Sequence, residues 1–591
     1  MLPLDAPFVL LDDASDIGEG ARLYRDPVRI VVAHRIAEVS PALAAVRAGQ
    51  RAGLHAAGYL AYEAAAAFEP VLGDPPETDA PLLWFGLFER WDDIADVAAL
   101  LPDPAGAWIG APVPAIGFAD YAARFDRVRE WIVAGDIYQA NLTYPATVPV
   151  RGDRRAVYAQ LRGRAKGGFG ALVNDGARWL LSLSPESFFA LSGRDLRCRP
   201  MKGTARRGAT PAEDERLAAG LAADPKQRAE NLMIVDLMRN DLARVATPGS
   251  VAVPDLFAVE RYPTLHQLVS TVTAELADGR DAIDVLAALF PCGSITGAPK
   301  LRAMQVIDAI EQAPRDVYTG AIGRIDADGD AAFNVAIRTL TLMDGAETAT
   351  FGVGGGIVAD SRVADEWAET HTKSAFLATP GPGFDLIETM TFDPLTGVAQ
   401  LERHLARLQA SAAAFAFGFD RHSVRNELQA ATFRLREPRR LRLLLAKSGA
   451  IAIEVTPLPP ASAGPVAVAV VPLPVDRHDF RLRHKTTDRG FYDRARAESG
   501  AFEVVFADPS GALTEGSFTS LFVARGGVLV TPPLARGLLP GVLRETLIAE
   551  GKAIEGELTA ADLTDGFFIG NALRGLIPAV VTVAKRAKAS L

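Results

Sequence analysis

Lys202 lies in a stretch whose neighbours shape the backbone around it. The stretch reads Arg199-Pro200-Met201-Lys202-Gly203-Thr204. Proline fixes φ and glycine frees it, so we expect a shaped turn here and no helix. A lysine in a dry site has a lowered pKa and can act as a nucleophile, whereas most lysines in such stretches are simply solvated. Taken alone, Lys202 leaves both interpretations open.

Two glutamates further along the chain have a spacing that suits a metal ion. Glu366, Glu369 and Lys373 stand at i, i+3 and i+7 of a helix that we expect to begin after Asp360-Ser361, a plausible N-cap. Residues at these spacings share one helix face. Carboxylate oxygens are ligands that Mg²⁺ prefers. A charged face in contact with solvent is the alternative interpretation.

Polar residues also fall inside expected strands. The stretch from Gly135 to Thr143 reads as a strand with Gln139 and Asn141 on one face, which is either a solvated edge or the lining of a polar pocket. Arg338 lies within the apolar run 336–340. An arginine inside an apolar strand is costly unless it is paired, and an anionic ligand is one such partner.

A second set of residues suited to chemistry follows residue 384. His484-Lys485-Thr486-Thr487 contains a lysine, and Thr514-Glu515-Gly516-Ser517 contains a glutamate. Residues 537–541 and 570–575 are glycine-containing turns. Turns of this kind expose N–H groups that can bind phosphate. One lysine, one glutamate and two such turns suggest pyridoxal phosphate.

Apolar patterns predict the elements that position these residues. Strands rich in aliphatic and aromatic residues are expected near 58–63, 81–88, 184–189 and 466–471, and within 315–358. Helices are expected over 121–135, 227–245 and 398–417. The second helix has an apolar stripe of Leu232, Val235, Met238 and Leu242, and the third carries Arg403, His404 and Arg407.

Length and composition bound the class of protein. With 591 residues the chain is too long for one hydrophobic core, so two to four domains are expected. No run of about twenty apolar residues could span a bilayer, and no basic residue precedes Arg22, so we expect neither a membrane span nor a secretory signal. The two cysteines, Cys198 and Cys292, lack metal-ligand spacing and suit a reducing cytoplasm. A net charge of −10 disfavours binding to nucleic acid.

The clearest boundary is the run Ala378-Thr379-Pro380-Gly381-Pro382-Gly383. Proline and glycine interrupt regular structure, so this run reads as a linker. We therefore expect one domain over residues 1–376, a linker over 377–384 and a second domain over 385–591.

The first domain resembles component I of aminodeoxychorismate synthase, one of the chorismate-utilising enzymes. The similar motifs occur in order: Gly135–Gln139, Ser184-Pro185-Glu186, Pro200–Thr204, Arg228–Asp241, His266, Ser294–Lys300, Tyr318, Arg338 and Gly354–Ser361. The resemblance implies a mixed α/β (α+β) fold in which antiparallel sheets pack together and helices cover them. It also implies chorismate as the substrate.

The resemblance implies a role for particular residues. Lys202 matches the nucleophile that attacks C2 of chorismate, and Glu186 matches the general acid. One Mg²⁺ would be bound by Glu230, Glu366 and Glu369, while Gln227 departs from a further acidic ligand position. The implied substrate-binding residues are Gln139, His266, Thr296, Lys300, Tyr318, Arg338, Gly354, Gly355 and Lys373.

Two positions distinguish this branch from its relatives. Anthranilate synthases resemble this family but have alanine in place of Lys202. Isochorismate and salicylate synthases use a lysine where this chain has Gln139, and an amide cannot activate water as that base does. Ammonia is implied to come from a separate glutamine amidotransferase subunit, because neither cysteine lies in a nucleophile elbow. Free ammonium is the alternative source.

The second domain resembles aminodeoxychorismate lyase and the fold-type IV pyridoxal phosphate enzymes, which include class IV aminotransferases. Lys485 matches the lysine that carries the cofactor, Arg407 matches the arginine that binds its phosphate, and Glu515 matches the glutamate that faces its pyridine nitrogen. The phosphate-binding turns match Val542, Leu543, Asn571 and Ala572. Departures are Gly570 and Ser520, where the family often has Thr and Asn, and the absence of an arginine-containing loop at 446–450.

Together the two resemblances predict a cytoplasmic, bifunctional enzyme that makes 4-aminobenzoate for folate synthesis. A synthase would aminate chorismate, and a lyase would then remove pyruvate. One alternative is that the second domain is an aminotransferase, and another is that it is an inactive docking or dimerisation module. A homodimer through the lyase-like domain and a tryptophan-like ligand in the first domain are further options that the sequence leaves open.

Overall fold

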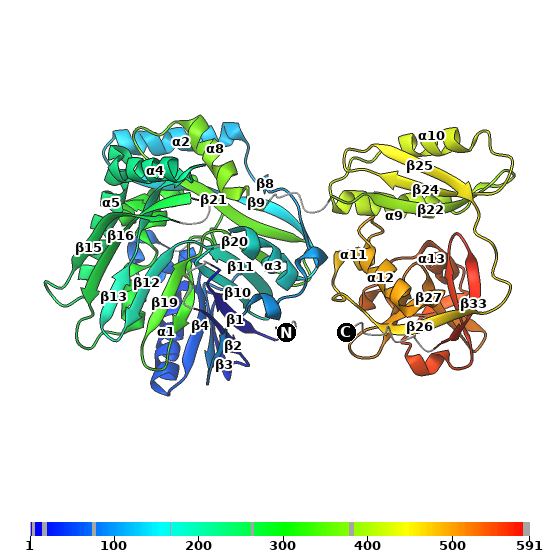
Figure 1. Ribbon diagram of the computed structural model, residues 1–591. Helices are drawn as coiled ribbons and strands as arrows, with labels where there is room; N and C mark the ends of the chain where they lie inside the picture. The colour runs from blue at the N-terminus through cyan, green and yellow to red at the C-terminus, as the bar shows by residue number, and fades with distance from the viewer. Residues whose placement is uncertain are drawn as a thin grey trace. The chain divides into compact units, whose positions relative to one another are not determined.

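A computed structural model of the chain describes residues 2, 6–14, 20–73, 78–165, 167–261, 265–377 and 383–582 (Figure 1). The chain divides into two compact units. Unit 1 comprises Met1–Leu101, Ala111–Val148 and Tyr158–Thr379, and unit 2 comprises Pro102–Gly110, Pro149–Val157 and Pro380–Leu591. Most of the linker expected over 377–384 lies outside the described residues.

Unit 1 is built on two large, antiparallel sheets. The first has eleven strands in the order β17-β9-β21-β20-β11-β10-β1-β2-β6, with β7 and β8 paired to β9. Their bounds are β17 Gly297–Ala298, β9 Gln139–Arg151, β21 Thr348–Ile357, β20 Thr339–Met343, β11 Arg178–Ser184, β10 Phe169–Asn174, β1 Phe8–Asp12, β2 Ala21–Arg25, β6 Asp92–Ile94, β7 Trp108–Ile109 and β8 Val113–Pro114.

The second sheet has ten strands in the order β14-β16-β13-β12-β19-β18-β4-β5-β3, with β15 paired to β16. Their bounds are β14 Met201–Arg206, β16 Leu265–Glu275, β13 Asp195–Cys198, β12 Ser187–Ser192, β19 Ala331–Val335, β18 Ala321–Ile325, β4 His55–Leu60, β5 Leu83–Phe88, β3 Arg29–Ala33 and β15 Ala252–Arg261. Strands β4 and β5 confirm the two apolar runs expected near the N-terminus. Every residue of β5 is buried.

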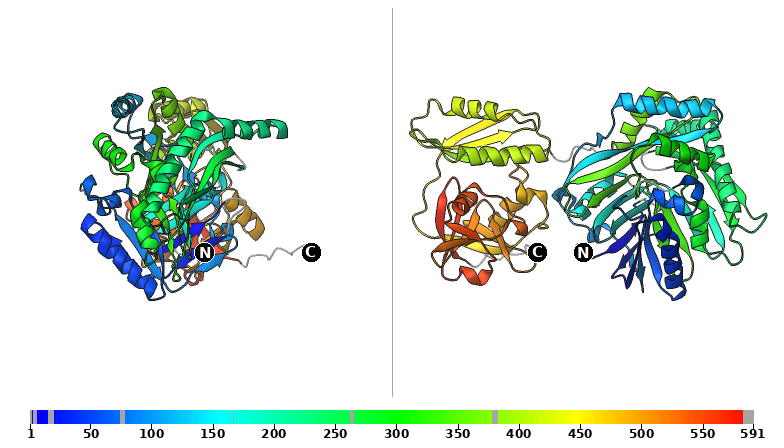
Figure 2. Two further views of the ribbon diagram at one scale, coloured as in Figure 1. Left: turned by 90° about the vertical axis from the view of Figure 1, so that its left-hand side faces the viewer. Right: turned by 180° about the vertical axis from the view of Figure 1, so that it is seen from behind.

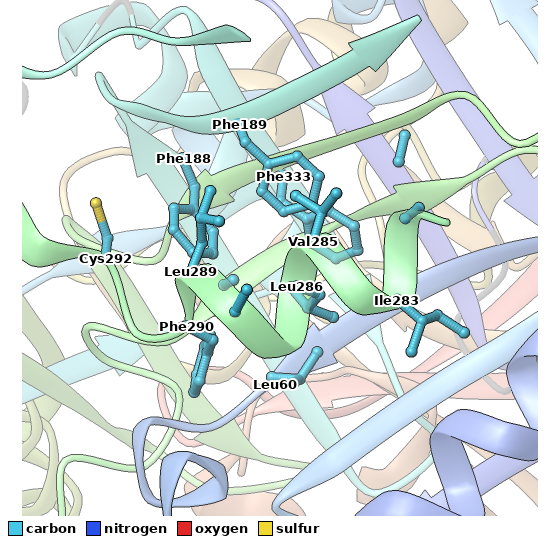
Figure 3. Close-up of a cluster of buried hydrophobic side chains, with 14 of the residues drawn as sticks. Leu60, Phe188, Phe189, Ile283, Val285, Leu286, Leu289, Phe290, Cys292 and Phe333 are labelled. Carbon is cyan, nitrogen blue, oxygen red and sulfur yellow. The ribbon is translucent and has the colours of Figure 1, made fainter. Parts of the chain in front are cut away.

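Helices accompany these sheets, and one of them fills the core. The helices are α1 Ile36–Arg51, α2 Phe118–Val133, α3 Arg154–Ala165, α4 Pro211–Ala223, α5 Pro225–Ala243, α6 Ala282–Leu289, α7 Lys300–Ile310 and α8 Val363–Ser374. Figure 3 shows side chains of α6, including Val285 and Leu289, among Phe188, Phe189 and Phe333. Burial of such side chains is the main stabilising contribution to a fold of this kind.

Two predictions about the helices of unit 1 need correction. Leu232 in α5 is 50% exposed, whereas Val235, Met238 and Leu242 are buried as expected. Helix α8 begins at Val363 with Arg362 as the N-cap residue, not at Asp360-Ser361. The hydroxyl of Ser361 instead donates to Glu366 at 2.7 Å.

Arg338 does not lie inside a strand. It falls in the gap between β19 and β20, with a left-handed φ of 50°. Residues other than glycine adopt this conformation rarely, and it costs conformational free energy. The prediction of a strand through Arg338 was therefore wrong, and the strained turn ends one strand and starts the next.

Unit 2 contains a small sheet and a larger one, which form separate layers in Figure 2. The small sheet has the order β23-β22-β24-β25, with bounds β23 Gly397–Val398, β22 Leu386–Asp393, β24 Arg439–Leu445 and β25 Ile451–Pro457. Helices α9, Leu401–Ala414, and α10, Arg421–Thr432, pack against it. Helix α9 confirms the helix expected over 398–417.

The larger sheet of unit 2 mixes parallel and antiparallel pairs in the order β28-β27-β26-β33-β32-β29-β30-β31. Its strands are β28 Leu513–Gly516, β27 Glu503–Ala507, β26 Val466–Pro472, β33 Gly575–Val581, β32 Phe567–Asn571, β29 Ser520–Arg525, β30 Val528–Thr531 and β31 Ala553–Glu555. Helices α11 Phe480–Arg483, α12 Gly490–Ser499 and α13 Val542–Ala549 complete the unit. Within the described ranges, no helix is both long and apolar enough to span a membrane.

Candidate active sites

Lys202 is positioned by an irregular strand. It lies in β14, where the pairing with β16 shifts between Met201 and Thr204 and Gly203 has a φ of +83°. The Nζ of Lys202 donates a hydrogen bond to the carbonyl oxygen of Ser294 at 3.1 Å. Burial lowers the pKa of Lys202, with Glu186 acting against this shift and Lys373 adding to it. The amine is thus held in a dry setting that favours its neutral, nucleophilic form.

Glu186 is the acid beside this lysine. Its side chain is 5% exposed, and its Oε1 has no hydrogen-bond partner among the described residues. Burial raises the pKa of Glu186, while the Ser294 hydroxyl and the Lys202 ammonium group oppose the shift. A carboxyl group with a raised pKa keeps its proton to a higher pH than an ordinary carboxyl group, which is the direction of shift that a general acid requires.

The glycine-rich end of β21 meets α8 next to these residues. Lys373 donates to the carbonyl oxygen of Gly354 at 2.9 Å and pairs with Glu369 at 2.8 Å. A Cβ on Gly355 would lie 3.2 Å from an oxygen of Glu366, so the glycine allows a close approach. The charges of Lys373 and Glu230 both act on Lys202. The structure thus gathers α5, α8, β14 and β21 around one site.

The three predicted metal ligands lie in this region, but their carboxylate oxygens do not converge on one position. Burial raises the pKa of Glu230 and of Glu366, and Glu369 raises both further. In the part of the chain that the structure describes, they do not form a group of ligand atoms within 4.8 Å; the group that does is Asp153, Asp476 and His478, elsewhere. Partly buried carboxylates that repel one another fit a divalent cation by chemistry.

Gln139 and His266 each keep one buried nitrogen without a partner in the described chain. Gln139 is the first residue of β9 and is 1% exposed, and its Nε2 is the nitrogen that has no hydrogen-bond partner in the described chain. A Cβ on Gly356 would lie 2.8 Å from that nitrogen. His266 in β16 contacts Asp214 through Nε2 at 2.9 Å, and its Nδ1 is the nitrogen without a partner there. These atoms suit a polar ligand.

The side chains of Thr296 and Lys300 form hydrogen bonds with other groups of the protein. Lys300 forms an ion pair with Asp241 and donates to the carbonyl oxygens of Leu289 and Pro291 at 2.9 and 3.2 Å. These partners account for the three N–H groups of its ammonium group. The hydroxyl of Thr296 likewise contacts backbone carbonyl oxygens. Both residues shape the loop that carries Ser294.

Arg338 and Tyr318 are two further predicted substrate-binding residues of unit 1. Burial lowers the pKa of Arg338, and no ion pair with its guanidinium group occurs among the residues described. Tyr318 lines a cavity of about 700 Å³ together with Arg315 and Glu311. Arg315 pairs with Glu311 at 2.8 Å and donates to the carbonyl oxygen of Ile295 at 3.3 Å. Arg315 therefore connects this cavity to Ile295, the residue that follows Ser294.

Lys485 lies in a cavity of about 470 Å³ in unit 2. Burial lowers the pKa of Lys485 to about 7, and Glu388 opposes that shift while Arg407 adds to it. Glu515 lines the same cavity and is 5% exposed. Burial raises the pKa of Glu515 to about 7, although the Tyr492 hydroxyl donates to it at 2.6 Å.

Arg407 is held by a carboxylate that sequence reasoning missed. Its Nε and Nη2 donate to Glu388 at 2.8 and 2.7 Å, and its Nη1 donates to the carbonyl oxygen of Pro540 at 2.9 Å. His404 contacts the same carboxylate at 2.6 Å. A lone glutamate inside the apolar run of β22 was the available signal, because such a residue must be paired. Two N–H groups of Arg407 remain for a phosphate.

The far end of this cavity fits a phosphate group. Val542 and Leu543 are the first residues of α13, where backbone N–H groups have no partner within the helix. A Cβ on Gly541 would lie 2.6 Å from the hydroxyl of Ser520, so only glycine leaves that space open. The side chain of Asn571 accepts from Leu573 and Arg574 and closes the turn around Ala572. The residues present therefore fit pyridoxal phosphate.

Both cysteines are buried away from solvent. Cys198 is 1% exposed and Cys292 is 5% exposed. Burial raises the pKa of Cys198 and raises that of Cys292 to about 12. Cys292 lies at one end of the cluster in Figure 3 and contacts the hydroxyl of Ser294 at 3.2 Å. Neither thiol is therefore available as a thiolate at neutral pH.

Comparisons with known proteins identify a family for each of the two segments. The model of the chorismate binding enzyme family matches residues 21–379, and that of class IV aminotransferases matches residues 385–581. Component 1 of aminodeoxychorismate synthase from Klebsiella aerogenes is 47% identical over 254 residues, covering 43% of this chain and 56% of the relative. Component 1 of anthranilate synthase from Streptomyces coelicolor is 38% identical over 368 residues, covering 54% of this chain and 71% of the relative.

The chain thus spans only about half the length of the aminodeoxychorismate synthase relative. Component I of anthranilate synthase from Streptococcus pneumoniae has a TM-score of 0.52 and 24% identity, covering 64% of this chain and 93% of the other, so it shows the shared fold. The match to the class IV model implies that unit 2 uses pyridoxal phosphate. By its matched residues, the chain belongs to the chorismate binding enzyme family and continues into a class IV aminotransferase segment.

Proposed function

We propose that unit 1 aminates chorismate to 4-amino-4-deoxychorismate, and that unit 2 then removes pyruvate to give 4-aminobenzoate, a folate precursor. The observation that carries the proposal is the setting of Lys202, a desolvated amine beside the buried acid Glu186. The boundary between the two enzymes would lie within residues 377–384.

In unit 1, Lys202 would attack C2 of the chorismate ring. The two ring double bonds shift, and the C4 hydroxyl leaves as water with a proton from Glu186. Ammonia then attacks C4, the double bonds shift back, and the amine of Lys202 is released. One difficult displacement becomes two easier ones.

The carboxylates of chorismate need cations. Glu230, Glu366 and Glu369 would hold Mg²⁺, which supplies positive charge to a substrate carboxylate. Arg338, which has no acidic partner among the described residues, would bind another. Gln139, His266, Tyr318 and the backbone at Gly354 and Gly355 would complete the substrate site, as hydrogen-bonding groups and as open space.

The ammonia would come from a separate glutamine amidotransferase subunit. The Klebsiella relative is named as a component 1, which is consistent with a second component. Both cysteines of this chain are buried with raised pKa values, so neither supports the thiolate chemistry of an amidotransferase.

In unit 2, bound pyridoxal phosphate would supply an electron sink for the substrate carbon that bears the amine. Arg407, Val542, Leu543 and Ala572 would hold the phosphate, and Glu515 would face the pyridine nitrogen. Lys485 would remove the proton at C4 of the substrate and return it to the departing enolpyruvate. Loss of pyruvate makes the ring aromatic, so no second amino acceptor is required.

A second candidate function is that unit 2 is an aminotransferase, because the family model that it matches is named for that activity. An inactive docking or dimerisation module is the third option. Incubating the chain with chorismate, ammonium and Mg²⁺ should yield 4-aminobenzoate and pyruvate. Amino-group transfer from an amino acid to 2-oxoglutarate, without pyruvate release, would instead identify an aminotransferase. If unit 2 formed neither product and bound no cofactor, the inactive docking or dimerisation module would be the remaining candidate.

A further inference from the structure

We propose that Arg440 binds a carboxylate of the substrate in the cavity of unit 2 and thereby makes that site selective for anionic amines. The inference rests on the proposed function of unit 2, and it adds the substrate class and the residue that selects it.

Arg440 is placed in the cavity by strand alternation. It lies in β24, where it pairs with Thr391 of β22 and Thr456 of β25. Its neighbour Leu441 is fully buried in the core of the small sheet, so Arg440 projects from the opposite face. There it lines the same cavity as Lys485, and its positive charge acts on that lysine.

Arg440 also differs from the other arginines of this cavity. Most of them are neutralised: Arg407 by Glu388, Arg442 by Glu454, Arg481 by Asp479 and Arg496 by Asp493. Arg489 and Arg574 donate to the carbonyl oxygens of Ser517 and Pro460. The Nε of Arg440 is buried, and throughout the described ranges nothing accepts a hydrogen bond from it.

A buried, unpaired donor on a charged group is costly, so a site that retains one is built for a partner absent from the protein. A guanidinium group matches a carboxylate with two parallel hydrogen bonds. The amine proposed to leave unit 1 carries two carboxylates. The hairpin at 446–450, which joins β24 to β25, contains no arginine, and Arg440, near the start of β24, would supply a cation from the same sheet.

The test uses the full chain loaded with pyridoxal phosphate and calorimetric binding of 4-aminobenzoate and its neutral isostere, 4-aminobenzamide. Wild type should bind the acid more tightly than the amide. Arg440→Gln should weaken binding of the acid by about ten- to a hundredfold, because a charge-assisted pair is lost. Binding of the amide should not change. Arg440→Lys should recover part of the preference.

Arg439→Gln is the matched control, because Arg439 is the adjacent residue in β24 and pairs with Glu437. It should bind both ligands as wild type does. Cofactor content, read from visible absorbance, should be equal in all variants. If Arg440→Gln keeps the preference for the acid, or loses the cofactor itself, the assignment of Arg440 is wrong.

The same data separate this inference from the proposed function. Wild type that binds the acid through Arg440 but forms no 4-aminobenzoate would overturn the lyase proposal and leave Arg440 as a carboxylate-binding residue. Wild type that shows no preference for the acid over the amide would overturn the inference, even if the chain made 4-aminobenzoate.

Discussion

Each unit presents one desolvated lysine, and the two lysines differ in their partners. Lys202 lies beside the buried acid Glu186, which can donate a proton to a leaving hydroxyl. Lys485 shares its cavity with Glu515 and several arginines, a lining that suits an anionic ligand. The sequence predicted both lysines through their motifs. It could not predict Arg440, because strand alternation reveals the exposed face but not the missing partner.

Replacing Lys202 should separate the two reactions. Lys202→Ala should slow amination of chorismate by on the order of a thousandfold or more, because a methyl group cannot act as the nucleophile. Pyruvate release from added 4-amino-4-deoxychorismate should stay at the wild-type rate. The measurement is product formation from each substrate with ammonium as the nitrogen source. Amination at an undiminished rate would show that another group is the nucleophile.

The rate of cofactor loading should depend on pH through Lys485. Burial lowers the pKa of this lysine to about 7, and only the neutral amine reacts with the aldehyde of pyridoxal phosphate. Below pH 7 the neutral fraction, and with it the loading rate of apo-protein, should fall about tenfold per pH unit; above pH 8 it should level off. Stopped-flow absorbance measures the rate. A rate that keeps rising to pH 10 would indicate an ordinary lysine.

Helices and strands bring together residues that are far apart in the sequence, and here the predictions were uneven. Helix α2 was predicted from its apolar pattern, whereas the strand expected over 135–143 was right only from Gln139, where β9 begins and then continues to Arg151. The stripe on α5 was wrong at Leu232, because helix periodicity shows which residues are apolar but not how wide the covered face is. The turn at Arg338 could not be predicted, because its left-handed backbone depends on contacts of two separate strands.

Helix α8 should control the metal requirement of unit 1. Glu366→Gln and Glu369→Gln should each raise the Mg²⁺ concentration needed for half-maximal amination by about tenfold or more, because a charged oxygen ligand is lost. Asp365→Asn is the control, since Asp365 is exposed on the same helix. Pyruvate release by unit 2 should not respond to any of the three changes. Identical Mg²⁺ titrations in all variants would show that these glutamates are not ligands of the metal.

Helix α6 should set the stability of unit 1. Leu286 is fully buried in the cluster of Figure 3, so Leu286→Ala should lower the free energy of unfolding by about 2–5 kcal/mol. Leu232→Ala, at the half-exposed position on α5, should change it by less than about 1 kcal/mol. Denaturant titration followed by tryptophan fluorescence compares the two. Equal losses would mean that α6 does not anchor the core.

At the scale of the whole chain, two family matches cover two successive segments, and sequence motifs predicted both families. The segments 102–110 and 149–157, which cluster with unit 2, could not be predicted, because their contacts join parts of the chain that are hundreds of residues apart. Arg155, for example, is buried between Asp153 and Asp476. Patterns within a window of the sequence contain no signal for such pairs.

The 591-residue chain should use ammonium as its nitrogen source and should not use glutamine. Its two thiols are buried, and burial raises their pKa values, so neither can attack the glutamine amide. Product formation with each nitrogen source is the measurement, and adding a glutamine amidotransferase subunit should restore turnover with glutamine. Turnover with glutamine by the chain alone would contradict this expectation.

The burial of Cys198 and Cys292 has a practical consequence for experiments. Because both native thiols are buried and protonated at neutral pH, a thiol-directed dye should not react with the folded chain. A cysteine introduced at an exposed position, such as Leu395, which is 94% exposed, would then be the single point of attachment. With one such cysteine in each unit, energy transfer between dyes would report the distance between unit 1 and unit 2, with no native cysteine removed.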